Sequence, residues 1–95
     1  MTPPFLVFRI HAIQRMFQRG ISKEEVKRAL QAGHVIEEYL EDQPYPSRLI
    51  MGWSGSRPLH VVVSDNPTGQ ETIVITVYEP DPEKWDASFR RRRTA

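Results

Sequence analysis

The chain has 95 residues and a mass of 11.1 kDa, and 39% of its residues are hydrophobic and 26% are charged. These values are typical of a globular protein and exclude disordered, collagen-like and low-complexity classes, so we expect one domain over residues 1–95 with an ordered core over 8–92. The sequence contains no cysteine, which excludes disulfide frameworks, thiolate metal sites and thiol nucleophiles. No apolar run has the length of a signal-peptide core or a membrane span, and we therefore expect a soluble, cytoplasmic protein.

The formal net charge of +1 hides an uneven distribution of charge along the chain. Residues 1–34 carry a net charge of +4, residues 35–46 carry −4, and the four consecutive arginines 90–93 add a basic end. Two basic ends around an acidic middle can steer an anionic partner, although the whole chain is nearly neutral.

Two helices are predicted in the first third of the chain. Apolar residues at helical spacing predict a first helix over Ile10–Arg19, which Gly20 terminates. A second helix begins at Ser22, whose spacing from Glu25 is that of a capping box, and it ends at Gly33.

From residue 34 the period changes to two, which predicts four strands: His34–Glu41, Arg48–Ser54, Pro58–Asp65 and Glu71–Glu79. Short turns separate them, including Asn66–Gly69, so an antiparallel meander is expected. Asp81, Pro82 and Glu83 suit the start of a short C-terminal helix. The predicted fold class is α+β, with two N-terminal helices on one face of a four-stranded antiparallel sheet.

The polar side of the first helix presents His11, Arg15 and Arg19 at intervals of four residues. Two cations and an imidazole in one row suit a phosphodiester, because the cations bind its charge and the imidazole moves a proton. The alternative is an ordinary solvated helix face.

Two residues in the predicted strands are candidates for chemistry. His60 interrupts an apolar strand and is either a hydrogen-bonded structural residue or a site residue, the latter favoured by Arg57 nearby. Tyr78 near the end of the last strand either anchors the following corner or presents its phenol to a nucleotide. Glu79 beside it is either a base or an edge charge.

No histidine or carboxylate spacing predicts a metal site, and no cofactor is expected. The run Arg90, Arg91, Arg92 and Arg93 indicates a mobile basic tail over residues 90–95, or alternatively an arm that binds phosphates without sequence selectivity.

Several stretches together resemble the bacterial family called domain of unknown function 4258. They are HAIQRM at 11–16, RGI at 19–21, GHVIE at 33–37, RPLHVV at 57–62 and TVYEPD at 76–81, followed by Trp85. This family is similar in layout to the RelE-type ribonuclease toxins and their motility-regulator relatives, and members of the family often appear beside a zinc-finger antitoxin. The resemblance implies a metal-independent endoribonuclease fold in which RNA lies across the open side of the sheet.

Metal-free RNA cleavage by the 2′-hydroxyl needs a base, an acid and cations around the phosphorane. We therefore expect His11 and His60 to carry protons, and Arg15 and Arg57 to stabilise charge. Tyr78 would act as acid or stacking surface, with Glu37 as a reserve base. These groups would meet in one cleft between the first helix and the exposed face of the third and fourth predicted strands. Arg19, Arg57, Arg90, Arg91 and Arg92 would bind the RNA.

Two other classes of function fit the same features. One is a noncatalytic module that binds nucleic acid or protein through the basic helix and the arginine run. The other is an interaction protein whose partner covers the acidic strand.

Overall fold

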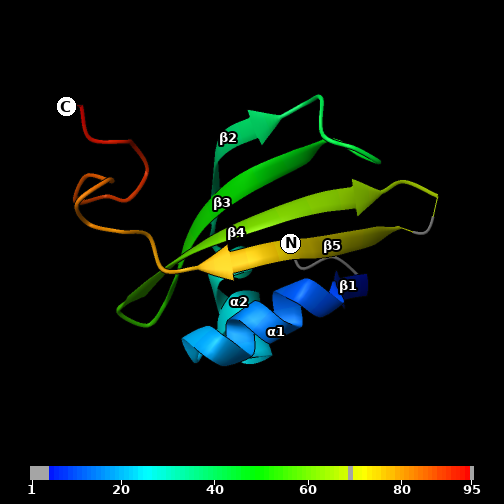
Figure 1. The fold of residues 1–95 in the computed structure, drawn as a ribbon, viewed down its shortest axis with the longest axis horizontal. Coiled ribbons are helices and arrows are strands. Elements are labelled where there is room, and N and C mark those ends of the chain that lie inside the picture. Colours follow the sequence, from blue (N-terminus) through cyan, green and yellow to red (C-terminus); the bar gives the residue numbers. More distant parts are fainter. Residues whose placement is uncertain (1–4, 69, 95) are drawn as a thin grey trace.

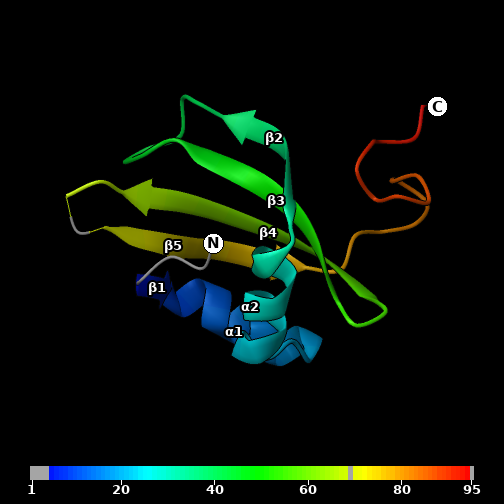
Figure 2. The same ribbon diagram turned by 180° about the vertical axis from the view of Figure 1, so that it is seen from behind.

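The computed structural model describes residues 5–68 and 70–94, which fold into a twisted sheet with two helices packed against it (Figure 1). Its elements in chain order are β1 (Phe5–Phe8), α1 (Ile10–Arg19), α2 (Lys23–Gln31), β2 (His34–Tyr39), β3 (Ser47–Ser54), β4 (Arg57–Asn66) and β5 (Glu71–Tyr78). In Figures 1 and 2 both helices lie below β5, with β1 beside α1, and the C-terminal segment, residues 81–94, projects beyond the end of β5.

The sheet is five-stranded and mixed, so the predicted four-stranded antiparallel sheet is wrong. Its order is β1-β5-β4-β3-β2. The strands β2 to β5 pair antiparallel as a meander, whereas β1 pairs parallel to β5, with Phe5 opposite Glu71 and Phe8 opposite Val74. The sequence did not reveal β1, because a run of four apolar residues contains no local signal for pairing with a strand more than sixty residues away.

The predicted C-terminal helix is also wrong, although its first turn starts as expected. The Asp81 carboxylate accepts a hydrogen bond from the Glu83 amide, and the Trp85 amide bonds to the Asp81 carbonyl at 3.0 Å. The chain then leaves the helical path, because Trp85 is buried against the sheet and Phe89 has a positive φ of 58°. Within the described part of this segment the chain forms turns and a single bridge between Trp85 and Arg92.

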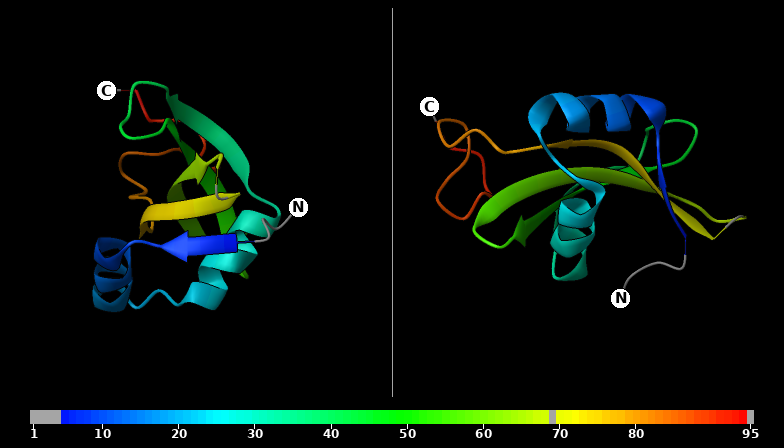
Figure 3. Two further views of the ribbon diagram at one scale, coloured as in Figure 1. Left: turned by 90° about the vertical axis from the view of Figure 1, so that its right-hand side faces the viewer. Right: turned by 90° about the horizontal axis from the view of Figure 1, so that it is seen from below.

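Local signals explain both helices. Gly20 ends α1 in the left-handed conformation at φ 65°, and its amide bonds back to the Met16 and Phe17 carbonyls. Ser22 and Glu25 form the capping box expected for α2. Only a short turn joins the helices, and Figure 3 shows that their axes run in different directions.

The helices and one face of the sheet share a single hydrophobic core. Its buried members from the helices are Ala12, Met16, Val26 and Ala29, and those from the central strands include Ile50, Leu59, Val61, Val63, Val74 and Val77. At Gly52 the backbone of α2 approaches β3 so closely that a Cβ atom would overlap the carbonyl group of Ala29. This contact fixes α2 against the sheet.

The other apolar residues of α1 do not join this core. Ile10, Ile13 and Phe17 are 72%, 40% and 87% exposed, whereas Met16 is 3% exposed. The helix therefore buries Ala12 and Met16, and not the whole apolar stripe that its sequence suggests.

Candidate active site

His60 and Tyr78 lie side by side on the sheet face opposite the helices. In register, His60 of β4 lies between Met51 of β3 and Tyr78 of β5. Its neighbours Leu59 and Val61 belong to the helix-side core, and alternation along a strand turns His60 to the other face. His60 is nevertheless fully buried, so something other than a helix covers it.

The C-terminal segment provides this cover. The Trp85 ring packs edge-to-face on the His60 ring with centroids 4.5 Å apart, and the Phe89 ring packs on Trp53 at 5.9 Å. The segment is held in shape by backbone hydrogen bonds from the Asp86 amide to the Arg91 carbonyl at 2.9 Å and from the Arg93 amide to the Lys84 carbonyl at 2.8 Å. Part of the arginine run is thus held in a folded segment, and Ala95 lies outside the described residues.

The hydrogen bonds of the His60 ring assign its tautomer. Nε2 lies 2.8 Å from the Phe89 carbonyl oxygen, which can only accept, so Nε2 carries the proton. Nδ1 is then an acceptor and lies 3.4 Å from the Tyr78 hydroxyl. Burial lowers the pKa of His60 below its ordinary value, while the Phe89 carbonyl partly opposes this by favouring the protonated ring. The imidazole is therefore a neutral acceptor toward the phenol.

A carboxylate and a guanidinium complete this group of side chains. Glu37 accepts hydrogen bonds from the Tyr39 hydroxyl at 2.7 Å and from Nε and Nη2 of Arg92 at 3.1 and 3.3 Å. Burial alone would raise the pKa of Glu37, but the hydrogen bonds from Arg92 and Tyr39 outweigh it and the pKa is lowered. The Arg92 guanidinium also lies over the Trp85 ring, 4.6 Å from its centroid.

Burial and the adjacent carboxylate raise the pKa of Tyr39 to about 12, so its phenol stays protonated and keeps donating to Glu37. We call the set Glu37, Tyr39, His60, Tyr78, Trp85, Phe89 and Arg92 the His60 network.

An open pocket of about 510 Å³ lies next to Tyr78. Arg19, Ile21, Arg57, Tyr78 and Glu79 line it, and we call it the Tyr78 pocket. Arg19 at the end of α1 donates a hydrogen bond of 2.7 Å from Nη1 to the Val77 carbonyl, which places its guanidinium beside the end of β5.

Arg57 ties this pocket to the turn between the helices. Its guanidinium donates to the Glu79 carboxylate at 2.7 Å, to the Glu25 carboxylate at 2.9 Å, and to the Gly20 and Arg19 carbonyls at 2.9 and 3.1 Å. These four contacts use four of its five N–H groups. Arg57 therefore shapes the pocket and has one N–H left for a ligand.

With this geometry in place, the chain can be compared with known proteins. The model of one family, described as Domain of unknown function (DUF4258), matches residues 8–79. The chain belongs to the DUF4258 family. No curated protein and no solved structure matches it. The match confirms the family resemblance seen in the sequence, and the segment that supplies Trp85, Phe89 and Arg92 follows the matched residues.

The structure of this DUF4258 domain brings together six of the residues predicted from the sequence. Glu37, His60, Tyr78 and Arg92 belong to the His60 network, and Arg19 and Arg57 line the pocket that Tyr78 shares. The other four predicted residues, His11, Arg15, Arg90 and Arg91, have exposed side chains outside the network and the pocket.

Some members of the site were missed or given another role. Tyr39 carries a usable signal, because it stands two positions from Glu37 on the same strand. Trp85 lies in the segment predicted as a short C-terminal helix, and the contribution of Phe89 is a backbone carbonyl that no side-chain pattern reveals.

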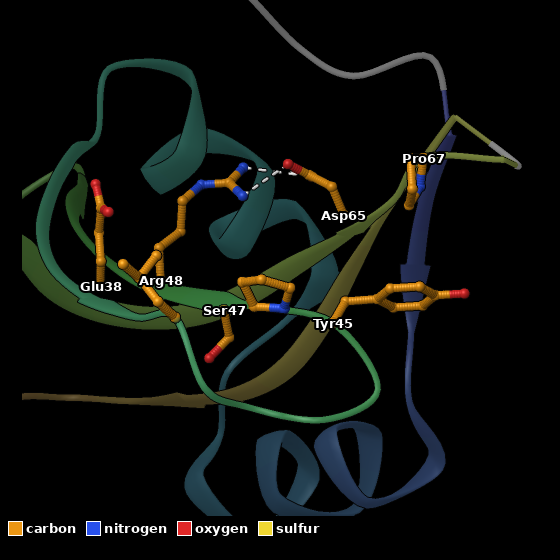
Figure 4. A pocket seen from close by; sticks show the side chains of 8 residues that line it. Glu38, Tyr45, Ser47, Arg48, Asp65 and Pro67 are labelled. Atoms are coloured by element: carbon orange, nitrogen blue, oxygen red, sulfur yellow. Dashed lines mark hydrogen bonds and ion pairs between the residues drawn. The ribbon is translucent and has the colours of Figure 1, made fainter.

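A second pocket of about 370 Å³ lies at the other end of the sheet, between the β2–β3 turn and the end of β4 (Figure 4). The Arg48 guanidinium crosses it to the Asp65 carboxylate at 2.8 Å, with Tyr45 and Pro67 alongside. None of the residues predicted as catalytic lines it.

Within residues 5–68 and 70–94, no group of three or more histidine or carboxylate side chains is arranged to hold a metal ion. In the same ranges, neither helix has the length and apolar character that crossing a bilayer requires.

Proposed function

We propose that this DUF4258 domain is a metal-independent endoribonuclease that cleaves RNA through attack of the 2′-hydroxyl on the adjacent phosphate. The observation that carries the proposal is the position of Tyr78. This residue lines an open pocket together with two arginines and a carboxylate, and it also contacts a buried imidazole of assigned tautomer.

The groups around the pocket match the needs of this reaction. Glu79 accepts the proton of the 2′-hydroxyl, whose oxygen forms a bond to phosphorus. The bond from phosphorus to the 5′-oxygen breaks, and Tyr78 donates its proton to that leaving oxygen. Arg19 and the remaining N–H of Arg57 stabilise the additional negative charge of the phosphorane. The products are a 2′,3′-cyclic phosphate and a 5′-hydroxyl.

The environment of Tyr78 supports its role as the acid. Burial raises the pKa of Tyr78, which keeps the phenol protonated before the reaction. Arg92 and Arg19 act in the opposite direction on the same pKa, because their positive charges stabilise the phenolate that proton donation leaves. His60 is a positioning residue here, since its neutral Nδ1 lies 3.4 Å from the phenol oxygen and its Nε2 proton is held by the Phe89 carbonyl. Before the reaction the phenol proton is directed toward Nδ1, and rotation of the hydroxyl about its C–O bond turns this proton to the 5′-oxygen that receives it.

We further propose that the enzyme acts in the bacterial cytoplasm as the toxin of a toxin–antitoxin pair, with a cognate antitoxin protein as its partner. The support for this part is the resemblance in layout to RelE-type toxins. Tightly induced expression should arrest growth of a bacterial host, and expression of the Tyr78→Phe variant should not.

The chemistry is tested with purified protein and a labelled single-stranded RNA. Wild-type protein should generate 2′,3′-cyclic phosphate and 5′-hydroxyl ends, and Tyr78→Phe should lower kcat by about 10²–10⁴-fold. Tyr45→Phe is the matched control, because Tyr45 lines the pocket at the other end of the sheet and belongs neither to the His60 network nor to the Tyr78 pocket. Folded wild-type protein that leaves RNA intact, or cleavage that survives a 2′-deoxy sugar at the cut position, would refute the proposal.

A second candidate is a noncatalytic module that binds nucleic acid. It is favoured by the complete burial of His60, with both ring nitrogens in internal contacts, and by the pairing of Glu37 with Arg92. Such a module would bind RNA with a steep salt dependence and yield no cyclic phosphate at any pH.

A further inference from the structure

The exposed row on α1 leads directly to the Tyr78 pocket. His11, Arg15 and Arg19 have exposed side chains, and they follow one another at intervals of four residues. The buried side chains of this helix, Ala12 and Met16, point in another direction. The last member of the row, Arg19, lines the pocket and bonds to the Val77 carbonyl beside Tyr78.

The spacing of the row suits a polyanionic strand. Four residues of an α-helix advance by about 6 Å along the axis, so the row places one donor about every 6 Å and extends about 12 Å from the pocket. This is similar to the separation of successive phosphates along a nucleic-acid strand. The sequence has no acidic residue before Glu24, so no carboxylate from α1 neutralises the row.

The opposite flank of α1 favours a single nucleic-acid strand as the ligand and not a duplex. A duplex presents two phosphate backbones and would need a second line of cations. That flank instead carries Ile10, Ile13 and Phe17, which are 72%, 40% and 87% exposed and attract no phosphate.

We infer that the α1 row guides the backbone of single-stranded RNA to the Tyr78 pocket, with successive phosphates on Arg19, Arg15 and His11. The inference rests on the proposed function, because it identifies the row as the path of that enzyme's substrate. Arg15 and His11 then act in binding the strand and not in the chemical step, which lies about 6 and 12 Å further along the helix.

The test measures binding of an uncleavable probe, a fluorescent single-stranded oligonucleotide with 2′-deoxy sugars throughout. Its dissociation constant is measured over a range of salt concentrations for wild type, Arg15→Gln and Lys27→Gln. Lys27 is an exposed cation on α2 and its loss changes the net charge equally, so it is the matched control. The slope of log K against log salt should be shallower by about 0.7 for Arg15→Gln and unchanged for Lys27→Gln.

Cleavage assays with unmodified RNA complete the design. Arg15→Gln should raise KM and change kcat less than twofold, in contrast to Tyr78→Phe, which lowers kcat. Equal salt slopes for Arg15→Gln and Lys27→Gln, or a duplex of the same length binding as tightly as the single strand, would overturn the inference. A wild type that shows the expected slopes but never cleaves RNA would refute the proposed function, and the slopes alone would still establish the row as a strand-binding surface.

Discussion

The stability of the folded chain should fall between pH 7.5 and pH 5.5, because His60 is buried in a neutral form. Burial lowers its pKa in the folded state, whereas in the unfolded chain the imidazole titrates near its ordinary value of 6.5. As the pH drops through that value, the unfolded chain binds a proton that the folded chain does not. Unfolding is then favoured, so stability is lost on acidification and is fully present above the unfolded pKa.

The magnitude follows from proton linkage. One proton bound only by the unfolded state changes the free energy of unfolding by at most about 1.4 kcal/mol per pH unit. From pH 7.5 to pH 5.5 the total loss cannot exceed about 1.4 kcal/mol, because the upper half of this window lies above the unfolded pKa. The carboxyls whose pKa is lowered, Glu25, Glu37 and Asp86, have ordinary values of 4.5 or below and affect stability at lower pH.

Urea unfolding at a series of pH values measures this effect, with His60→Gln as the test and His11→Gln as the exposed control. Glutamine can still donate to the Phe89 carbonyl but does not titrate, so His60→Gln should flatten the dependence on pH, and His11→Gln should keep it. A wild type with constant stability between pH 7.5 and 5.5 would refute the reasoning. The same slope retained in His60→Gln would show that another group causes it.

Two further predictions concern the packing of the helices, and both are measured by urea unfolding. Gly52→Ala should cost several kcal/mol or prevent folding, because its Cβ would overlap the backbone of Ala29. The control Gly55→Ala, in open space at φ 61°, should cost about 1 kcal/mol. Equal losses of stability in the two variants would contradict the close approach of α2 to β3. Met16→Ala should lower the free energy of unfolding by about 2–5 kcal/mol, because Met16 is buried in the core. Phe17→Ala, at an 87% exposed position, should change it by no more than about 0.5 kcal/mol. A large loss of stability in Phe17→Ala would mean that this ring is covered in solution.

The elements predicted correctly from the sequence are those that local interactions determine. The bounds of α1, the capping box of α2 and the four antiparallel strands follow from side-chain period, a terminal glycine and short turns. Strand β1 depends on parallel pairing with β5 across most of the chain, which local period does not encode. The C-terminal segment starts like a helix at Asp81, but the burial of Trp85 against His60 outweighs that local preference.

The sequence predicted a site residue only where the residue type is unusual for its position in the fold. A histidine in an apolar strand and a tyrosine at a strand end both attract attention, and cross-strand register makes them neighbours. The contact between Arg92 and Glu37 spans 55 positions and depends on the path of the C-terminal segment, which was predicted as a short helix followed by a mobile basic tail. His11 and His60 do not meet in one cleft as expected, because α1 packs on one face of the sheet and His60 lies on the other.

Tyr78 lies between two parts of the site, one that can orient a catalytic group and one that can admit substrate, and the sequence could not distinguish them. The His60 network is closed around the imidazole, which is fully buried and bonded through Nε2 to the Phe89 carbonyl, whereas Arg92, paired with Glu37, is exposed at its edge. The Tyr78 pocket is open and carries arginine side chains at its rim. A closed network can orient a group and set its pKa, and an open pocket can admit a phosphate. Because Tyr78 belongs to both, a change in the network should affect the pH dependence of cleavage, and a change at the pocket rim should affect substrate binding.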